Sequence, residues 1–360
     1  MRILLIGLGG IGQRHTRNLR ALLGPDPDLI AYRTRGLSAV VTPELSLDST
    51  RNVEQEYSIR SYGTLESALD QSPDIAFVCN PSSLHVEVAL KCAEAGCDLF
   101  IEKPLSNSLH NVDKLIALVS ATRRVAMVGY QLRFHPCIER LRTILDAGAI
   151  GRLLAVHAAI GEFMPYWHRY EDYRTMYAAR ADLGGGVILS QIHELDYLYS
   201  LFGVPRRVFA LGGHWSSLDI DVEDTASIML ECMTEGRPLP VHVQLDYLQY
   251  PPSRKCEVIG DNGKVSIDLI ANETILYTGR RADGERFKVD HFERNQLFLD
   301  ELKHFLKCVD ARQAPVASLQ DGAVSLRIAL AAKESIATGQ LVQVESLGSK
   351  YEVIEANRHV

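Results

Sequence analysis

The sequence has 360 residues, of which 46% are hydrophobic and 23% are charged, a balance typical of a globular protein with more than one domain. Its formal net charge of -7 argues against a nucleic-acid partner and gives no reason to expect attraction to an anionic membrane. No apolar run approaches the roughly 18 residues that a membrane-spanning helix needs. The seven cysteines include no C-x-x-C pair of the kind found in zinc knuckles, and an odd number of scattered cysteines favours reduced thiols in a cytoplasmic protein.

The chain begins with an apolar run that leads directly into glycines. Residues 3–6 predict a strand buried on both faces, and the run is too short for a signal peptide. Gly7 permits a tight turn, Gly9 allows a pyrophosphate to approach the backbone, and Gly12 allows the helix predicted from about residue 11 to 23 to pack on the strand. The strand, turn and helix N-terminus predict a dinucleotide site formed by Gly7, Leu8, Gly9, Gly10, Ile11 and Gly12.

The second predicted strand, residues 28–33, ends in basic residues instead of the acidic residue that would hold the ribose 2′-hydroxyl of NAD. Arg33, Thr34 and Arg35 suit a 2′-phosphate, because arginine binds phosphate through paired, charge-assisted hydrogen bonds. They predict NADP as the cofactor, with NAD as the other candidate; a basic, solvated turn is the alternative interpretation. The stretch 37–62 predicts a loop with a short helix.

Strands and helices then alternate. Strands are predicted over 74–79, 97–101 and 124–128, and helices over 65–69, 84–95 and 112–120. This order predicts a doubly wound parallel sheet in a dinucleotide-binding domain over residues 1–129. Ligands of such sheets bind beyond the carboxyl ends of the strands, so the turn that begins with Asn80 and Pro81 is expected to face the cofactor. His85 opens the next helix, and either contacts the nucleotide or stacks on its neighbours.

The strand over 97–101 ends in Glu102, Lys103 and Pro104. A partly buried lysine at the mouth of the sheet is able to share a proton with a substrate hydroxyl or to hydrogen-bond it. A solvated lysine that caps the strand end is the competing interpretation of these residues.

Four motifs occur in a characteristic order: GLGGIG at 7–12, CNPSSLH at 79–85, EKP at 102–104 and GYQLRFHP at 129–136. With them the sequence resembles the glucose–fructose oxidoreductase / inositol dehydrogenase / MocA family of NAD(P)-dependent sugar dehydrogenases over essentially its whole length. The resemblance implies that Lys103 is catalytic and contacts both substrate and cofactor. It also implies that the nicotinamide side of the cleft is lined by Asn80, Pro81, Glu102 and Gln131.

The second half begins with a predicted strand over 150–163, followed by an aromatic and charged loop. This loop contains side chains that stack on a sugar face or hold an anionic group, and we predict four substrate contacts in it: Trp167, Tyr173, Arg174 and Tyr177. They favour an amino or acidic sugar, nucleotide-linked or phosphorylated. An exposed amphipathic helix is the alternative interpretation.

A single helix is predicted from residue 187 to 201, ending at Gly203, and it carries His193. An isolated histidine is more often a buried core residue than a catalyst. In the resembled family, however, a histidine of this segment stands beside the EKP lysine and the reacting carbon. The resemblance therefore implies that His193 accepts the proton as hydride leaves a carbinol carbon.

Members of that family commonly have an aspartate three or four residues before this histidine. This chain has Leu189 and Ser190 there, which leaves two alternatives for the acid–base work: Lys103 and His193 suffice, or the chain does different chemistry. Ser190 is a further predicted substrate contact. A metal site made by His193, Glu194 and Asp196 is poorly spaced, and no metal is predicted.

From residue 208 to 277 the pattern changes to short alternating strands, separated by turns such as Asp261-Asn262-Gly263. It predicts a large, mostly antiparallel open sheet in an α+β domain over 130–360, which binds substrate and mediates oligomerisation. The resemblance implies a homodimer or homotetramer formed through that sheet. Two amphipathic helices are predicted over 292–309 and 319–338, and the second is expected to pack back toward the first domain.

The combined prediction is an NAD(P)-dependent oxidoreductase that transfers hydride between nicotinamide and a secondary alcohol of a sugar, amino sugar or cyclitol. Two alternatives remain open. One is an NAD-dependent glycosidase of the same fold, in which a transient ketone permits elimination of the glycosidic substituent. The other is a protein that binds NAD(P) without catalysing a reaction.

Overall fold

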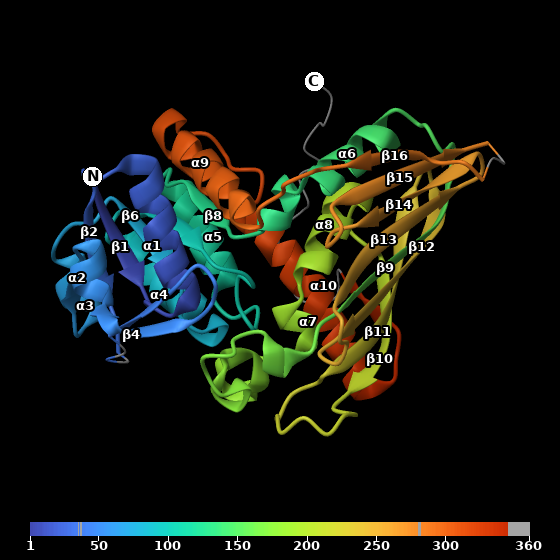
Figure 1. The fold of residues 1–360 in the computed structure, drawn as a ribbon. Coiled ribbons are helices and arrows are strands. Elements are labelled where there is room, and N and C mark those ends of the chain that lie inside the picture. The colour runs from blue at the N-terminus through green and yellow to red at the C-terminus, as the bar shows by residue number, and fades with distance from the viewer. Residues whose placement is uncertain (35, 37, 280–281, 345–360) are drawn as a thin grey trace.

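The computed structural model describes residues 1–344 except 35, 37, 280 and 281. Two sheets lie side by side, with helix α10 (Leu319–Thr338) between them (Figure 1). The first sheet has six parallel strands in the order β5-β2-β1-β6-β7-β8. Its strands are β1 (Arg2–Ile6), β2 (Asp28–Tyr32), β5 (Arg60–Tyr62), β6 (Ile75–Val78), β7 (Asp98–Ile101) and β8 (Ala126–Val128).

Helices cover the parallel sheet on both faces, as the doubly wound fold predicted from the sequence requires. They are α1 (Gly10–Leu23), α2 (Val53–Tyr57), α3 (Leu65–Leu69), α4 (His85–Glu94) and α5 (Val112–Ala121). Every residue of β6 and β7 is buried, because helices cover both faces of the sheet. This burial explains the continuous apolar runs in the sequence of such strands. The predicted fold class of this half is confirmed.

The stretch predicted as a loop with one short helix contains more regular structure than expected. β3 (Ala39–Val41) and β4 (Leu47–Asn52) form an antiparallel ribbon, and β5 adds an edge strand to the parallel sheet. The sequence LDSTRN of β4 is polar and mostly exposed, and it lacks the alternation of apolar and polar residues by which a strand is predicted. The ribbon is held by backbone pairing.

The second sheet has nine strands in the order β16-β15-β14-β13-β9-β12-β11-β10-β17. The strands are β9 (Leu153–Gly161), β10 (Arg207–Gly213), β11 (Thr225–Thr234), β12 (Arg237–Asp246), β13 (Ser253–Gly260), β14 (Gly263–Asp268), β15 (Glu273–Thr278), β16 (Glu285–Lys288) and β17 (Val342–Gln343). Only β9 and β12 pair in parallel, so the predicted mostly antiparallel sheet is confirmed. Gly260 pairs with Gly263, which leaves Asp261 and Asn262 as the predicted turn.

The helix predicted over 187–201 is two helices, α7 (Val187–Ser190) and α8 (His193–Phe202). The helical backbone is interrupted at Gln191, with φ -101° and ψ 29°, and the side-chain amide of Gln191 donates to the carbonyl oxygen of Asp246 on β12. This tertiary contact explains the break that the apolar periodicity did not predict. It places His193 in the first turn of α8.

The last two helices return to the parallel sheet. α9 (Asn295–Ala311) packs on α1, and its Phe305 ring lies 5.9 Å from the ring of Phe77 on β6 and 5.5 Å from that of Phe100 on β7, between centroids. α10 packs on α5 and β8 as well as on β10 of the second sheet. The C-terminal helices therefore contribute to the cores of both sheets.

No helix in the described part of the chain is long and apolar enough to cross a membrane. The seven cysteines are free and buried.

Candidate active site

The glycine turn connects the end of β1 with the start of α1. Gly7 has a φ of 91°, a region that favours glycine, and a Cβ there would lie 3.0 Å from the carbonyl oxygen of Cys79. A Cβ on Gly12 would collide with the carbonyl oxygen of Gly7, so Gly12 allows the close approach of α1 to the turn. A Cβ on Gly9 would meet no atom within 4 Å. The backbone of Gly9 therefore borders open space.

The first turn of α1 provides what a phosphate requires. No side chain caps the helix N-terminus, and its first turn contains no acidic residue. Free N–H groups and the positive end of the helix dipole stabilise an anion at such a position. The glycine turn thus fits the pyrophosphate of a dinucleotide, and Gly7–Gly12 would hold it.

The basic residues after β2 do not all lie open to a 2′-phosphate. The Arg33 Nη1 atom lies 2.7 Å from Glu54 Oε1 on α2, and the Arg33 side chain is only 10% exposed. Thr34 is exposed, and Arg35 lies outside the described residues. Glu54 was not among the predicted site residues, and it brings an acidic side chain to the basic residues after β2.

His85 joins two turns at the edge of the parallel sheet. Its Nε2 lies 2.8 Å from the carbonyl oxygen of Asn80, after β6, and its Nδ1 lies 2.8 Å from that of Pro104, after β7. Both ring nitrogens thus face backbone carbonyls, a role different from the predicted stacking or nucleotide contact. Asn80 Oδ1 is buried and has no hydrogen-bond partner among the described residues, so it is available to a ligand beside Pro81.

Glu102 is buried and its Oε1 lies 2.6 Å from Nε2 of His15, while its Oε2 accepts the N–H of Lys103 at 3.2 Å. Burial acts to raise the pKa of Glu102, but the hydrogen bond to His15 and the charge of Lys103 outweigh it, and the pKa is lowered. Glu102 therefore supports the Lys103 turn as an anion. His15 was not predicted as a site residue; its place three residues after Gly12 was the available signal.

Lys103, one of the two predicted catalytic residues, reaches the segment that carries the other, His193. Lys103 Nζ donates a 2.8 Å hydrogen bond to the carbonyl oxygen of Ser190, at the end of α7. His193 is 5% exposed, and its Nδ1 has no hydrogen-bond partner within the described ranges. Burial lowers the pKa of His193 well below its usual value, and the charges of Lys103, Arg254 and Arg294 lower it further. The imidazole is therefore neutral at neutral pH and free to accept a proton.

The acidic neighbours of His193 on α8 are bound to arginines. Arg254 donates to both oxygens of Glu194 at 2.7 and 2.9 Å, and Arg133 donates to both oxygens of Asp196 at 2.7 and 2.8 Å. Across the described residues, no group of histidines, cysteines and carboxylates is arranged to hold a metal ion. Gln131 is buried at the start of the short helical turn η2 (Gln131–Phe134), an element that contacts α8.

The aromatic loop of the second half is a series of short turns, not the exposed amphipathic helix considered as its alternative. They are η3 (Met164–Tyr166), η4 (Tyr173–Thr175), η5 (Tyr177–Ala179) and η6 (Ala181–Leu183). Tyr177 is partly buried against the core, and Trp167 lies edge-on to Tyr247, 5.0 Å between ring centroids, with its indole N–H buried and unpartnered among the described residues. Tyr173 accepts a 3.1 Å hydrogen bond from the N–H of Asp219.

Arg174, predicted to contact an anionic group of the substrate, is paired with an acidic neighbour. Its side chain is 53% exposed, and its Nη2 lies 2.6 Å from Asp172 Oδ2 in the same turn. The guanidinium charge is thus neutralised locally. The sequence analysis did not predict the ion pair between Arg174 and Asp172, although the two residues are only two positions apart.

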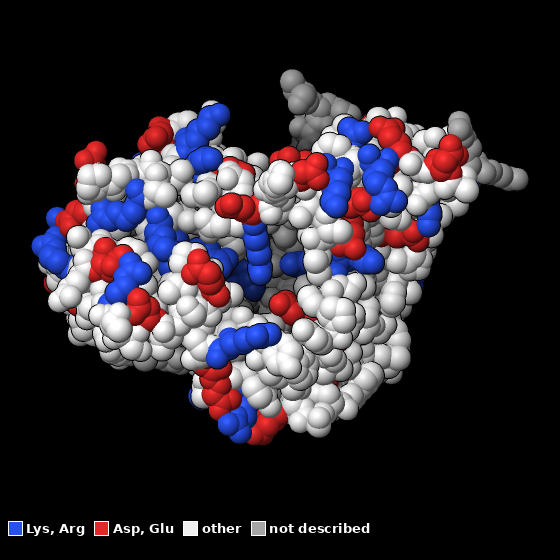
Figure 2. Space-filling model, in the orientation of Figure 1, with Lys and Arg blue, Asp and Glu red and all other residues white. Residues whose placement is uncertain are grey.

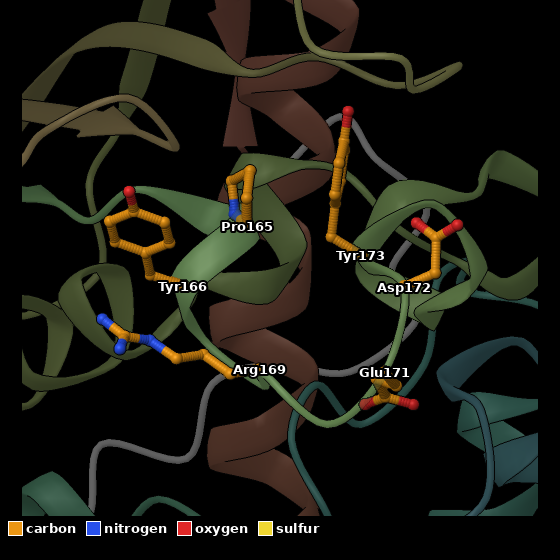
Figure 3. Close-up of a pocket in the computed structure, with 6 residues that line it drawn as sticks. All are labelled: Pro165, Tyr166, Arg169, Glu171, Asp172 and Tyr173. Carbon is orange, nitrogen blue, oxygen red and sulfur yellow. The ribbon is translucent and has the colours of Figure 1, made fainter.

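A surface cavity of about 370 Å³ lies within the same loop, with Tyr166 and Arg169 on one side and Tyr173 on the other (Figure 3). Its lining residues are Pro165, Tyr166, Arg169, Glu171, Asp172 and Tyr173. Neither Lys103 nor His193 lines this cavity.

Between the two halves of the molecule the surface is hollowed, and Lys and Arg side chains gather in this hollow (Figure 2). Tyr170 of the aromatic loop reaches the glycine turn from the second half: its hydroxyl lies 2.7 Å from the position of a Cβ on Gly10. Burial raises the pKa of Tyr170 to about 12. Tyr170 was not among the predicted site residues, and its position shows that the loop borders the glycine turn.

Two family models match the chain. The oxidoreductase family model with an NAD-binding Rossmann fold matches residues 1–130, and the GFO/IDH/MocA C-terminal domain matches residues 138–266. The chain is 27% identical to myo-inositol 2-dehydrogenase of Thermotoga maritima, covering 96% of this chain and 99% of that protein. It is 25% identical to scyllo-inositol 2-dehydrogenase (NAD(+)) of Bacillus subtilis, covering 96% of each.

Solved structures share the fold. Levoglucosan dehydrogenase in complex with NADH and levoglucosan superposes with a TM-score of 0.79 at 19% identity, covering 96% of this chain and 99% of that one. A probable dehydrogenase from Thermotoga maritima gives a TM-score of 0.72 at 25% identity, covering 96% of this chain and 100% of that one.

Proposed function

This chain belongs to the GFO/IDH/MocA oxidoreductase family, and on that premise we propose that it is a nicotinamide-dependent dehydrogenase acting on a secondary alcohol of a sugar, amino sugar or cyclitol. The observation that carries the proposal is the hydrogen bond from Lys103 Nζ to the carbonyl oxygen of Ser190, because it brings the lysine of the first sheet to the segment of His193. The relatives named for dehydrogenation of inositols support it.

In this proposal Lys103 and His193 divide the work on the alcohol. The ammonium of Lys103 donates a hydrogen bond to the alcohol oxygen and stabilises the negative charge that develops there. The neutral imidazole of His193 accepts the hydroxyl proton at a ring nitrogen. The dinucleotide, when bound, supplies the hydride acceptor. Burial between the two sheets keeps water from competing for these contacts.

The pocket around these two groups would be completed by side chains of both halves. Asn80 is proposed to contact the nicotinamide side, because its buried Oδ1 lacks a partner in the described part of the chain. Ser190 and Trp167 are proposed to contact the substrate, with Tyr173 and Tyr177 at the loop that borders the site. Arg174 is not retained as a substrate contact, because Asp172 binds it.

The test is to incubate the protein with the oxidised dinucleotide and each of a panel of sugars and cyclitols, and to measure the absorbance of the reduced nicotinamide. A rise in absorbance with at least one secondary alcohol is expected. Release of a glycosidic substituent with flat absorbance would identify the glycosidase instead. Binding of the dinucleotide with no reaction on any compound of the panel would favour the non-catalytic alternative.

For the form of the dinucleotide we propose NADP, with Arg33 and Thr34 at its 2′-phosphate. Glu54 lies 2.7 Å from Arg33 and has to give way to the phosphate, whereas NAD leaves this ion pair intact. Separate titrations with NADPH and NADH test the choice. We expect tighter binding of NADPH, and a larger preference in Glu54→Gln, which removes the competing charge. Tighter binding of NADH by both proteins would refute the assignment.

The outer face of the nine-stranded sheet is proposed to bind a second copy of this chain. Apolar side chains on this face are exposed: Phe209 by 38%, Leu211 by 57% and Met229 by 45%. Their clustering on the adjacent strands β10 and β11 supports an interface. Light scattering of the wild type and of Leu211→Glu tests it, because a charge on the interface is expected to shift a dimer or tetramer toward monomer.

A further inference from the structure

Two arginines between the glycine turn and His193 form no hydrogen bond or ion pair with any residue that the structure describes. Arg14, on α1, is half-buried, and Arg294, directly before α9, is exposed. Arg14 Cζ lies 4.5 Å from the ring centroid of Phe298 on α9, a cation–π contact that fixes its stem. In the same region Arg254 and Arg133 are each bound bidentately by a carboxylate.

The contact between α1 and α9 keeps the two guanidinium groups near each other. Asn18, one helical turn after Arg14, exchanges amide hydrogen bonds of 2.9 and 3.4 Å with Asn295, which follows Arg294. The start of α9 is therefore pinned against the face of α1 that carries Arg14. Arg14 packs on Phe298, which lies one helical turn after Arg294. Residues four apart share one face of a helix, so Arg14 and Arg294 lie on the same side of the start of α9.

The charges around this pair leave a positive site. Burial lowers the pKa of Arg14 to about 10, and the charge of Arg294 acts in the same direction. Although the residue as a whole has exposed surface, the protein around its guanidinium group lowers the pKa of Arg294, with the charge of Arg254 as the second cause. Two carboxylates oppose these effects: Glu102 acts on Arg14 but is bound to His15, and Glu162 acts on Arg294. Like charges held together in a crowded cleft destabilise each other until an anion binds.

The pair also spans the two ends of the proposed reaction site. Arg14 lies near Tyr170, whose hydroxyl covers Gly10 of the glycine turn. Arg294 acts electrostatically on His193 at the other end. An anionic group between these arginines would therefore belong to a ligand of the active-site cleft.

We propose that Arg14 and Arg294 form an anion subsite of the cleft, which takes a carboxylate or phosphate group of the bound ligand. Arginine binds such planar or tetrahedral anions through paired hydrogen bonds. The inference rests on the proposed function and adds that the substrate is an acidic or phosphorylated sugar. The pyrophosphate of the dinucleotide carries the same chemistry, so the experiment separates the two sources.

The experiment uses calorimetric titration of four full-length proteins: wild type, Arg14→Met, Arg294→Gln and Arg237→Gln. Methionine keeps an apolar stem on Phe298 while removing the charge. Arg237, exposed at the start of β12, has no described partner and controls for the loss of one positive charge. In one arm NADH is added to the free protein; in the other, inorganic phosphate is added to protein already saturated with NADH.

If the subsite binds the substrate anion, phosphate binds the NADH-loaded wild type and binds Arg14→Met and Arg294→Gln about tenfold or more weakly, with NADH affinity unchanged. If it binds the pyrophosphate, the loss appears in the NADH arm. Arg237→Gln follows the wild type in both cases. Unchanged affinity of both variants in both arms overturns the subsite. Both arms measure binding and not turnover, so the result on the subsite is independent of the test of the proposed dehydrogenase activity. An active dehydrogenase whose variants bind phosphate and NADH like the wild type would refute the subsite alone. An inactive protein whose variants lose phosphate binding would refute the proposed activity alone.

Discussion

The turns at the edge of the parallel sheet and the aromatic loop over 164–183 both border the cleft, yet they are built differently. The turns are buried and tied together across the sheet, by His85 between the turns after β6 and β7 and by His15 on Glu102. The aromatic rings of the loop pack on the rest of the protein, as Trp167 does on Tyr247, but its charged side chains pair with near neighbours at the surface, such as Arg174 with Asp172. The comparison teaches that the charged groups of the sheet turns are fixed by buried contacts across the sheet, while those of the loop are fixed by exposed pairs close in sequence.

The strongest test of the sheet turns is Lys103→Met. Removing the ammonium that reaches Ser190 is expected to lower kcat/KM by about 10²–10⁴-fold, because a positioned proton-sharing group contributes on that order. Steady-state kinetics on the best alcohol of the panel measures the effect, with the exposed Lys114→Met as the control. Activity near that of the wild type would remove Lys103 from the mechanism.

A second test separates the role of the glycine turn in dinucleotide binding from its role in the stability of the free protein. Gly9 has φ -73°, and a Cβ there meets no protein atom within 4 Å, so Gly9→Ala is expected to keep the melting temperature of the free protein. The added methyl group enters the space proposed for pyrophosphate and should weaken dinucleotide binding by about tenfold to a hundredfold, roughly 1.4–2.7 kcal/mol. Fluorescence titration measures it. The melting temperature of the free variant controls for folding, and equal affinities of Gly9→Ala and the wild type would place the pyrophosphate elsewhere.

A third test concerns a buried carboxyl behind the sheet turns. Glu301 on α9 is fully buried, and both its oxygens lack a hydrogen-bond partner among the described residues. Burial raises the pKa of Glu301 well above its usual value, and the charges of Glu102 and Asp196 raise it further.

The folded protein thus keeps this proton where the unfolded chain has lost it. The free energy of unfolding should therefore fall as pH rises from about 4.5 through the pKa of the folded state. Glu301→Gln should flatten that dependence in urea unfolding, whereas the exposed Glu334→Gln should leave it unchanged. An equal slope in both variants would show that Glu301 is ionised in the folded protein.

The smallest effect is expected in the loop. Arg174→Ala removes an exposed ion pair with Asp172, and such pairs contribute about 0–1 kcal/mol. Its kinetic constants for an anionic sugar should stay within about twofold of the wild type, since a locally paired arginine makes no substrate contact. A large rise in KM would return Arg174 to the site and break the contrast between the two regions.

The sequence predicted the parallel sheet because its strands are continuous apolar runs and because Gly7 and Gly12 occupy positions where a Cβ would clash. It did not predict the break between α7 and α8, since the apolar periodicity continues across Gln191 and the interruption depends on a contact with β12. Lys103 and His193 were predicted through the family resemblance, not from spacing. Arg14 and Arg294 were missed because their proximity depends on the packing of α9 on α1.

That packing also bears on how the chain is synthesised. Phe305 of α9 packs on Phe77 and Phe100, which His15 of α1 also contacts, so the covering of these two rings is completed only after every strand of the first sheet has been made. A nascent chain that emerges from the ribosome in order leaves these rings partly uncovered until α9 has been made. Fragments that stop before residue 295 should consequently aggregate or recruit chaperones, even though they contain every strand of the parallel sheet.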